Sequence, residues 1–248
     1  TLTVSNPPAA DAAREPDAEA MVSASAAPTD VGAYDGDPIV ETQVLVIGAG
    51  PGGYTAAFRS ADLGQRTTLV ERYETLGGVC LNVGCIPSKA LLHTADVMRS
   101  VEAMASHGVT YGAPTIDLPA LRDWKGSVVG KLTKGLAGLA KQRGVDVVHG
   151  TAVFTSPHSV RVEGPEGPIH IRFQHAIIAA GSQATQIPAF PNDDPRLMDS
   201  TDALELDTIP ERLLVVGGGI IGLEMATVFA ALGTRVTVVE LLDGLMPG

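Results

Sequence analysis

The alternation of apolar runs with glycine-rich turns predicts one β-α-β unit early in the chain. The run QVLVIGAG, residues 43–50, is short, apolar and ends in glycines. A segment with the length and composition of a helix follows at 51–64, and a second apolar run lies at 66–71. Short apolar runs bounded by glycine predict buried strands, so the pattern indicates two parallel strands joined by a helix.

Two long helices and several short strands follow this unit. The first helix is predicted from about 84 to 106, and the second over 118–143. The second helix carries apolar residues at helical spacing, namely Leu132, Leu136, Leu139 and Ala140. Short strands are then predicted over 145–150, 151–154, 159–163, 169–173 and, as a buried run, 176–182.

The pattern of the first unit returns near the end of the chain. Residues 212–240, RLLVVGGGIIGLEMATVFAALGTRVTVVE, repeat strand, glycine turn, helix and strand almost step for step. We therefore expect an α/β fold with two Rossmann-like dinucleotide-binding units and parallel sheets. Because the chain stops at Gly248, just after the second unit's second strand, we expect that unit to be incomplete and the chain to be a fragment.

Residues 1–38 differ from the rest in composition. They hold ten alanines, five prolines and seven acidic residues, with Arg14 as the one basic residue and no periodic apolar face. Such a segment cannot bury enough apolar surface to offset the entropy lost on ordering, so we expect a disordered linker. Its charge of −6 is more than half of the chain's −11. A ragged tail and a tether to another domain are both compatible with this composition.

The overall composition excludes several classes of protein. Of 248 residues, 45% are hydrophobic but only 4% aromatic, which suits close helix–strand packing in an α/β protein. The net charge of −11 argues against nucleic acid and anionic membranes as partners. The sequence shows no apolar stretch of 18 residues and no basic segment leading into an apolar one. We therefore expect neither a membrane span nor a secretion signal, and a cytoplasmic location.

Each β-α-β unit carries a G-x-G-x-x-G motif between strand and helix, and an acidic residue 18 positions after the third glycine. The first glycine takes the tight turn, the second lets the backbone approach a pyrophosphate, and the third lets the helix pack on the strand. The N–H groups at the helix start bind phosphate. The candidate dinucleotide-binding residues are Gly48, Gly50, Pro51, Gly52, Gly53 and Glu71 in the first unit, and Gly217, Gly219, Ile220, Ile221, Gly222 and Glu240 in the second.

The acidic residues predict which nucleotide is preferred. A carboxylate accepts hydrogen bonds from ribose hydroxyls and repels a 2′-phosphate. No arginine near Glu240 offers the usual alternative, so the second site is expected to prefer NAD to NADP. One such motif alone is often only a glycine-rich turn, but two in the same context indicate two dinucleotides.

The only two cysteines of the chain lie between these motifs, in LGGVCLNVGCIPSKALL. Cys80 and Cys85 could be small buried apolar residues or half of a zinc site. A zinc site needs two more ligands, and the chain has no further cysteine and no His-x₃₋₅-His pair, so no metal is expected. The helix start and Lys89 instead favour thiolates. A reactive dithiol between two dinucleotide sites indicates electron transfer from dithiol to flavin to nicotinamide.

The segment GGVCLNVGCIPSKALL resembles the redox helix of the pyridine nucleotide–disulfide oxidoreductase family, and is most similar to its dihydrolipoamide dehydrogenase branch. Glutathione reductases usually have lysine where Ser88 stands, and mercuric reductases usually have valine where Leu81 and Ile86 stand. The resemblance covers roughly residues 41–248. It implies FAD and NAD as cofactors, an FAD-binding domain over 39–190 and the start of an NAD-binding domain over 191–248.

The resemblance also implies roles for single residues. Cys80 would be the interchange thiol that meets the substrate, and Cys85 the thiol against the flavin, whose thiolate gives a charge-transfer band. Lys89 would lie near flavin N5, with Glu224 as its partner beside the nicotinamide; the alternative for both is an ordinary surface charge. The further FAD contacts that the resemblance implies are Arg72, Gly78, Val79, Cys80, Gly150, Ala152, Ala180 (where the family usually has threonine), Gly181 and Ser182.

The implied reaction oxidises dihydrolipoamide to lipoamide. The substrate attacks a Cys80–Cys85 disulfide, a mixed disulfide at Cys80 resolves, and FAD passes hydride to NAD⁺. The family's base is a histidine held by a glutamate in a C-terminal interface domain of the partner subunit. That domain is missing here, so we expect the chain alone to be inactive and the whole protein to be a homodimer.

The expected partners are a lipoyl-lysine domain, for which residues 1–38 would serve as a tether, and a 2-oxoacid dehydrogenase complex. Two alternatives stay open. One is an NAD(P)H-dependent disulfide reductase of the glutathione or mercuric reductase type. The other is a flavoprotein subunit that binds dinucleotides without catalysis.

Overall fold

The structure is a computed structural model that describes residues 3–4 and 40–246. In chain order its elements are β1 (Thr3–Val4), β2 (Val40–Ile47), α1 (Pro51–Asp62), β3 (Thr67–Glu71), α2 (Gly78–Val83), α3 (Cys85–Ala103), the 3₁₀ helix η1 (Met104–His107), α4 (Leu118–Gln142), β4 (Asp146–His149), β5 (Thr151–Ser156), β6 (Ser159–Gly164), β7 (Gly167–Ile178), α5 (Ser200–Glu205), β8 (Arg212–Val216), α6 (Ile220–Ala231) and β9 (Arg235–Val239).

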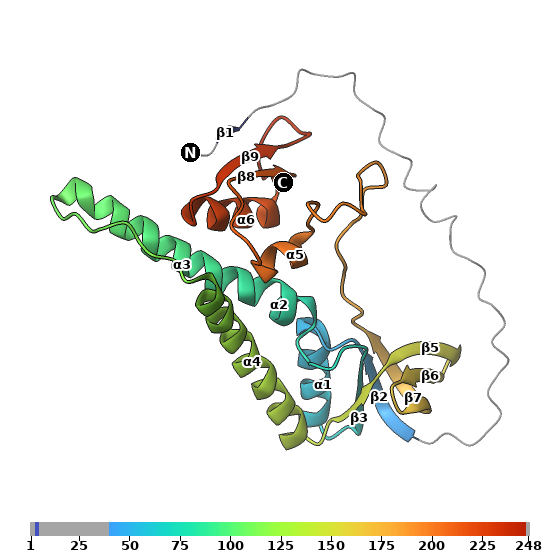
Figure 1. The fold of residues 1–248 in the computed structure, drawn as a ribbon. Coiled ribbons are helices and arrows are strands. Elements are labelled where there is room, and N and C mark those ends of the chain that lie inside the picture. Colours follow the sequence, from blue (N-terminus) through green and yellow to red (C-terminus); the bar gives the residue numbers. More distant parts are fainter. Residues whose placement is uncertain (1–2, 5–39, 247–248) are drawn as a thin grey trace.

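The strands form two sheets (Figure 1). The larger has the order β4-β3-β2-β7-β6-β5, in which β4, β3, β2 and β7 run parallel while β7, β6 and β5 alternate in direction. The smaller has the order β1-β9-β8 and is parallel throughout. The predicted α/β class is confirmed, and both predicted β-α-β units are present, with α1 and α6 as their crossover helices.

The centre of the larger sheet is buried on both faces. Successive residues of β2 point to opposite sides, so Val46 packs with Phe58 of α1 and Leu136 of α4. Leu45 packs instead with the cluster that includes Ile171 and Val160 of the antiparallel strands. Each fully buried aliphatic side chain stabilises the fold by about 1.5–3 kcal/mol. The strands whose carboxyl ends carry the site are therefore held from both sides.

The second unit packs on the first through helix α3. Helix α6 has the sequence IIGLEMATVFAA, which is apolar on nearly every side. Its buried Met225 and Phe229 belong to one cluster with Leu91 of α3, Leu204 of α5 and Val236 of β9. A helix that is apolar all round must be enclosed, and here α3, α5 and β9 enclose it. The two glycine loops are thereby brought into one body.

Three predicted elements differ from the structure. A separate helix, α2, precedes the one that was predicted, because Gly84, at φ −143° and ψ −114°, breaks the helical path. β7 is one strand from Gly167 to Ile178, where two were predicted, because His175 continues the pairing with Val44. The prediction that 176–182 is a buried strand is wrong, since Ile178 is 67% exposed. Helix α5 was not predicted.

The linker and domain boundaries are only partly described. Thr3–Val4 pair with β9 as β1, which differs from the disorder expected for 1–38. Residues 5–39 lie outside the described residues, so the linker, like the boundaries at 38 and 190, remains a prediction.

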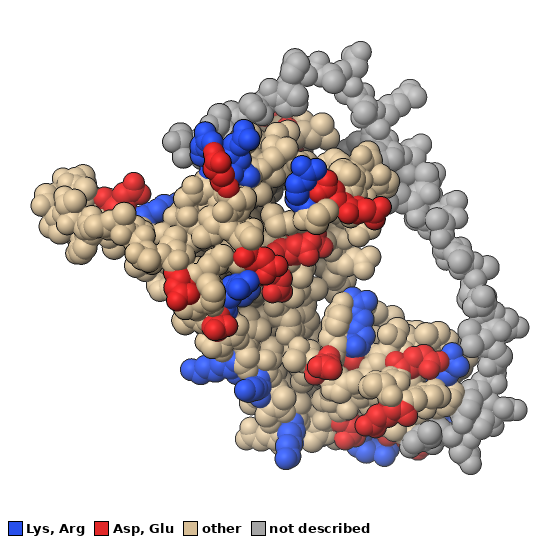
Figure 2. Space-filling view, viewed as in Figure 1, with Lys and Arg blue, Asp and Glu red and all other residues tan. Residues whose placement is uncertain are grey.

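Charged residues are interspersed over the visible face (Figure 2). Lysine and arginine alternate with aspartate and glutamate, and several of them form ion pairs, such as Arg235 with Glu211 and Arg122 with Asp207. Over residues 40–246, none of the helices combines the length and apolar character needed to cross a membrane.

Candidate functional site

The two glycine loops have the same backbone geometry. Gly48 and Gly217 take φ values of +96° and +107°, in the left-handed region that glycine favours. A Cβ on Gly53 would lie 1.7 Å from the Gly48 carbonyl oxygen, and one on Gly222 would lie 2.2 Å from that of Gly217. The first and third glycines therefore make the tight turn and the close helix contact for which the motif was singled out.

Each loop is fixed by the acidic residue at the end of the unit's second strand. Glu71 Oε2 accepts a hydrogen bond from Ala49 N at 2.8 Å, and its Oε1 accepts one from Tyr73 N at 3.1 Å. Glu240 repeats the arrangement, with Gly218 N at 2.6 Å and Leu242 N at 2.9 Å. A carboxylate has room for about four hydrogen bonds, so capacity remains for ribose hydroxyls. The prediction did not foresee this second task of holding the loop.

The N-termini of α1 and α6 are open to an anion. Gly50 and Gly219 are the N-caps, and neither helix has a side-chain capping hydrogen bond. A Cβ on Gly219 would meet no atom within 4 Å, and one on Gly50 would meet only the Gly78 Cα at 3.9 Å. Backbone N–H groups and the helix dipole attract phosphate at such a terminus. Both loops thus fit the pyrophosphate of a dinucleotide.

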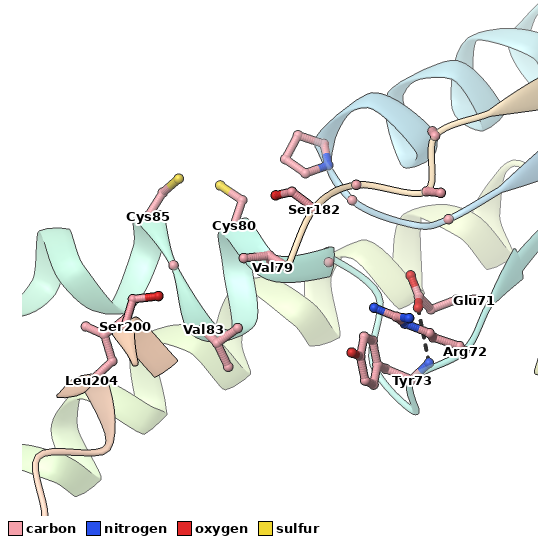
Figure 3. Close-up of a pocket in the computed structure, with 18 of the residues that line it drawn as sticks. Glu71, Arg72, Tyr73, Val79, Cys80, Val83, Cys85, Ser182, Ser200 and Leu204 are labelled. Atoms are coloured by element: carbon pink, nitrogen blue, oxygen red, sulfur yellow. Dashed lines mark hydrogen bonds between the residues drawn. The ribbon is translucent and has the colours of Figure 1, made fainter. Parts of the chain in front are cut away.

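An elongated cavity of about 550 Å³ runs from the first loop to the cysteines (Figure 3). Glu71, Arg72 and Tyr73 lie at one end, and Cys85 and Leu204 at the other. The volume is within the range of about 300–1,000 Å³ usual for ligand pockets. The predicted residues that the structure brings together in its wall are Gly48, Gly50, Pro51, Glu71, Arg72, Gly78, Val79, Cys80, Cys85, Lys89, Gly150, Ala152, Ala180, Gly181, Ser182, Ile220, Ile221 and Glu224.

Some predicted residues do not line this cavity, and some lining residues were not predicted. The former are Gly52, Gly53, Gly217, Gly219, Gly222 and Glu240. Of the second unit, only the start of α6 reaches the cavity, so a site at Glu240 would be separate from it. The residues that sequence reasoning missed are Ile47, Val70, Tyr73, Val83, Gly84, Ser88, Thr151, Ala179, Ser200, Leu204 and Met225. Most of them neighbour a predicted residue, but Ser200 and Leu204 come from α5 and have no local motif.

The redox helix is built directly on the first glycine loop. Gly77 N donates to Ala49 O at 2.8 Å. A Cβ on Gly78 would lie 2.6 Å from the Gly50 Cα, so two backbones meet where only glycine fits. Asn82, between the cysteines, donates from Nδ2 to Gly78 O at 2.9 Å. The dithiol is therefore held at a fixed place relative to the candidate phosphate site.

The two thiols face the same side of the cavity from different helices (Figure 3). Cys80 lies in α2 and is partly buried, and Cys85 begins α3 and is exposed; both are free thiols. Burial and the neighbouring Cys85 raise the pKa of Cys80 to about 11. The prediction that the helix start and Lys89 make Cys80 a thiolate is therefore wrong for this dithiol. Desolvation outweighs the lysine, whose charge is already paired.

Lys89 and Glu224 form an ion pair across the two units. Lys89 Nζ of α3 donates to Glu224 Oε1 of α6, and this hydrogen bond raises the pKa of Lys89. The side chain of Lys89 is 60% exposed and that of Glu224 is 20% exposed. The predicted partnership of the two residues is confirmed as a contact. Their places beside flavin and nicotinamide remain predictions.

Two dinucleotide loops flanking a dithiol, on parallel sheets, match the fold of flavoprotein disulfide reductases. The chain belongs to the pyridine nucleotide-disulphide oxidoreductase family, which it matches over residues 42–248.

Relatives carry one recurrent name. A dihydrolipoyl dehydrogenase of Vibrio cholerae serotype O1 is 55% identical over 208 residues, 84% of this chain and 44% of the relative. Dihydrolipoyl dehydrogenase 2 of Haloarcula marismortui is 49% identical over 217 residues, 86% of this chain and 45% of that protein. This chain thus spans less than half the length of the curated relatives it matches.

Among solved structures, the HOCl-induced flavoprotein disulfide reductase RclA of Escherichia coli is similar. It superposes with a TM-score of 0.70 at 32% sequence identity, over 83% of this chain and 43% of RclA.

Proposed function

We propose that this chain binds FAD and NAD and takes part in the oxidation of dihydrolipoamide to lipoamide through Cys80 and Cys85. The observation that carries the proposal is that one cavity joins both thiols to the first glycine loop. The choice of dihydrolipoamide is supported by the relatives named dihydrolipoyl dehydrogenase, at 48–57% identity.

The residues of the cavity fit FAD in a definite order. The N-terminus of α1 would hold the pyrophosphate, and Glu71 the adenosine ribose. Arg72, Gly150 and Ala152 would enclose the adenine end. The flavin end would lie among Gly78, Val79, Cys80, Lys89 and Ala180–Ser182. NAD would bind at the second loop, with its ribose on Glu240. When bound, FAD accepts two electrons from the dithiol and delivers them to NAD⁺ as a hydride.

The chain's own part is a balanced thiol–disulfide exchange. A thiolate of dihydrolipoamide attacks Cys80 Sγ of a Cys80–Cys85 disulfide, the S–S bond breaks, and Cys85 leaves as a thiolate. The second substrate thiol loses its proton and attacks the substrate sulfur bonded to Cys80. Lipoamide forms with its ring disulfide, and the chain's dithiol retains the two electrons. The released Cys80, with its pKa of about 11, takes up a proton at neutral pH.

The raised pKa creates a need for a base. At pH 8 a thiol with a pKa near 11 is ionised in about one molecule per thousand, so the reverse attack by Cys80 is slow without help. Among the described residues that line the cavity there is no histidine. His93 is exposed on α3 and lies outside that wall. We propose that the base comes from a partner subunit, as the family resemblance implies, in a homodimer.

The decisive experiment is an absorbance titration of the FAD-loaded protein with dihydrolipoamide. Reduction should produce a long-wavelength charge-transfer band when the Cys85 thiolate lies against the flavin. C85S should retain FAD and lose the band, while C80S should show the band without added substrate. A wild-type protein that binds no FAD, or that binds it and gives no band, would refute the proposal.

A second candidate is reduction of another disulfide by a reduced nicotinamide, which the similarity to RclA favours. Comparing dihydrolipoamide with other thiols and disulfides, with NADH and NADPH, separates the two. Partners remain part of the proposal: a lipoyl-lysine domain and a 2-oxoacid dehydrogenase complex, in the cytoplasm.

A further inference from the structure

A histidine joins two loops at the end of the cavity away from the cysteines. His149 is the last residue of β4, and its Nδ1 lies 2.8 Å from Tyr73 O, in the loop after β3. A carbonyl oxygen only accepts, so Nδ1 must carry the hydrogen. The next residue, Gly150, donates its backbone N–H to Glu71 O at 2.8 Å. Side chain and backbone thus bind the two loops together at neighbouring positions.

Both loops line the cavity where the adenosine of FAD would lie. Glu71, Arg72 and Tyr73 form one side, and residues 150–152 form the other. The Arg72 guanidinium carbon lies 4.8 Å from the centre of the Tyr73 ring, and Tyr73 N donates to Glu71 Oε1 (Figure 3). The backbone position of Tyr73 therefore sets both the Arg72 side chain and the Glu71 carboxylate.

The loop after β4 is the fixed member of the pair. Gly150 is buried at φ +153°, and a Cβ there would lie 2.4 Å from Glu163 O, so strand β6 packs directly against it. Tyr73 is 53% exposed and Arg72 is exposed too. The hydrogen bond from His149 therefore ties an exposed loop to an anchored one.

We propose that His149 is a positioning residue for the nucleotide end of FAD: its Nδ1–H holds the Arg72–Tyr73 loop against residues 149–151. His149 does not line the cavity, so it acts through Tyr73 rather than by touching FAD. The inference rests on the proposed function, in which the first loop binds the FAD pyrophosphate. It concerns affinity at the adenosine end and leaves the dithiol chemistry unchanged.

The test measures binding to protein stripped of FAD. FAD affinity is followed by quenching of flavin fluorescence, and ADP, which carries the adenosine and phosphates alone, is measured by competition. The variants are H149A, which removes the donor, and H149N, whose Nδ2 can stand in for Nδ1. H107A is the matched control, because it removes an exposed histidine from η1.

We expect H149A to weaken both FAD and ADP about three- to tenfold, the usual worth of one hydrogen bond. H149N should bind within about twofold of wild type, and H107A should be unchanged. Equal affinities for H149A and H107A would overturn the inference, as would a loss of FAD affinity without loss of ADP affinity, or no rescue in H149N. Wild-type protein that binds no FAD would refute the proposed function itself, which the other outcomes leave standing.

Discussion

At the scale of single residues, the third glycine of each motif is determined by a backbone contact that any side chain would break. We predict that G53A destabilises the protein by about 2 kcal/mol or more, because the new Cβ would lie 1.7 Å from Gly48 O. G52A is the matched control in the same helical turn, since its Cβ meets nothing within 4 Å. Urea denaturation followed by circular dichroism measures both. Equal midpoints for the two variants would contradict the prediction.

The thiol of Cys80 gives a second prediction at this scale. Desolvation and Cys85 raise its pKa to about 11, from the usual 9.0. The folded dithiol therefore binds its proton more tightly than the unfolded chain does, and the stability this contributes is present below pH 9 and is lost as the pH rises towards 11. In reduced, FAD-free protein, alkylation of Cys80 should increase up to about pH 11.

Mass spectrometry of the Cys80 peptide after iodoacetamide treatment reads out this profile. C85S is the informative variant. It removes the contribution of the second thiol but not desolvation, the larger cause, so its midpoint should fall between the wild-type value and 9.0. A wild-type midpoint at or below 9.0 would show that burial does not control this thiol.

At the scale of elements, helix α4 contains more glycine than a stable helix needs. Gly126, Gly130, Gly135 and Gly138 all lie within it, and a Cβ on any of them would meet no atom within 4 Å. Glycine inside a helix costs about 0.5–1 kcal/mol relative to alanine. We predict that G135A raises the free energy of unfolding by about that amount, measured by urea denaturation.

The control for α4 is G108A. Gly108 ends η1 at φ +85°, where space is also open but alanine is strained, so this variant should destabilise the protein. Stabilisation by both variants would mean that open space alone decides the outcome, contrary to the helix argument.

Elements differ in how far their sequences reveal them. The two β-α-β units were predicted because strand, glycine loop and helix are local patterns. Helix α2 was missed because its break depends on Gly84, where a Cβ would lie 2.9 Å from Val79 O. Helix α5 has six residues and owes its position to contacts from far along the chain, including the hydrogen bond from Lys125 Nζ to Leu204 O. No periodicity in residues 200–205 could reveal that contact.

At the scale of the whole molecule, the site combines predictable loops with unpredictable walls. The glycines, the acidic residues and the cysteines could be predicted because each answers to a local requirement of phosphate, ribose or redox chemistry. Ser200 and Leu204 reach the same cavity only because α5 packs beside α6 and α3. The raised pKa of Cys80 could not be predicted either, since it depends on burial and on the pairing of Lys89 with a residue 135 positions away.

That pairing gives the last prediction, because it couples the second unit to the dithiol. Lys89 lowers the pKa of Cys80, and Glu224 offsets its charge. E224Q should free the lysine charge, lower the pKa of Cys80 and speed its alkylation at pH 8, by about twofold for a screened charge. K89M should slow the same reaction. Changes in opposite directions are expected because the two variants leave charges of opposite sign beside the thiols.

Stability separates this electrostatic effect from loosening of the interface between α3 and α6. An exposed ion pair contributes about 0–1 kcal/mol, so both variants should unfold close to wild type. E211Q is the control, since it breaks the Arg235 ion pair, which joins β9 to the residue before β8 and so lies within the second unit. If E224Q and K89M both accelerated alkylation, the dithiol would be responding to greater exposure rather than to charge. The ion pair would then act as a structural clasp between the units, with no electrostatic influence on Cys80.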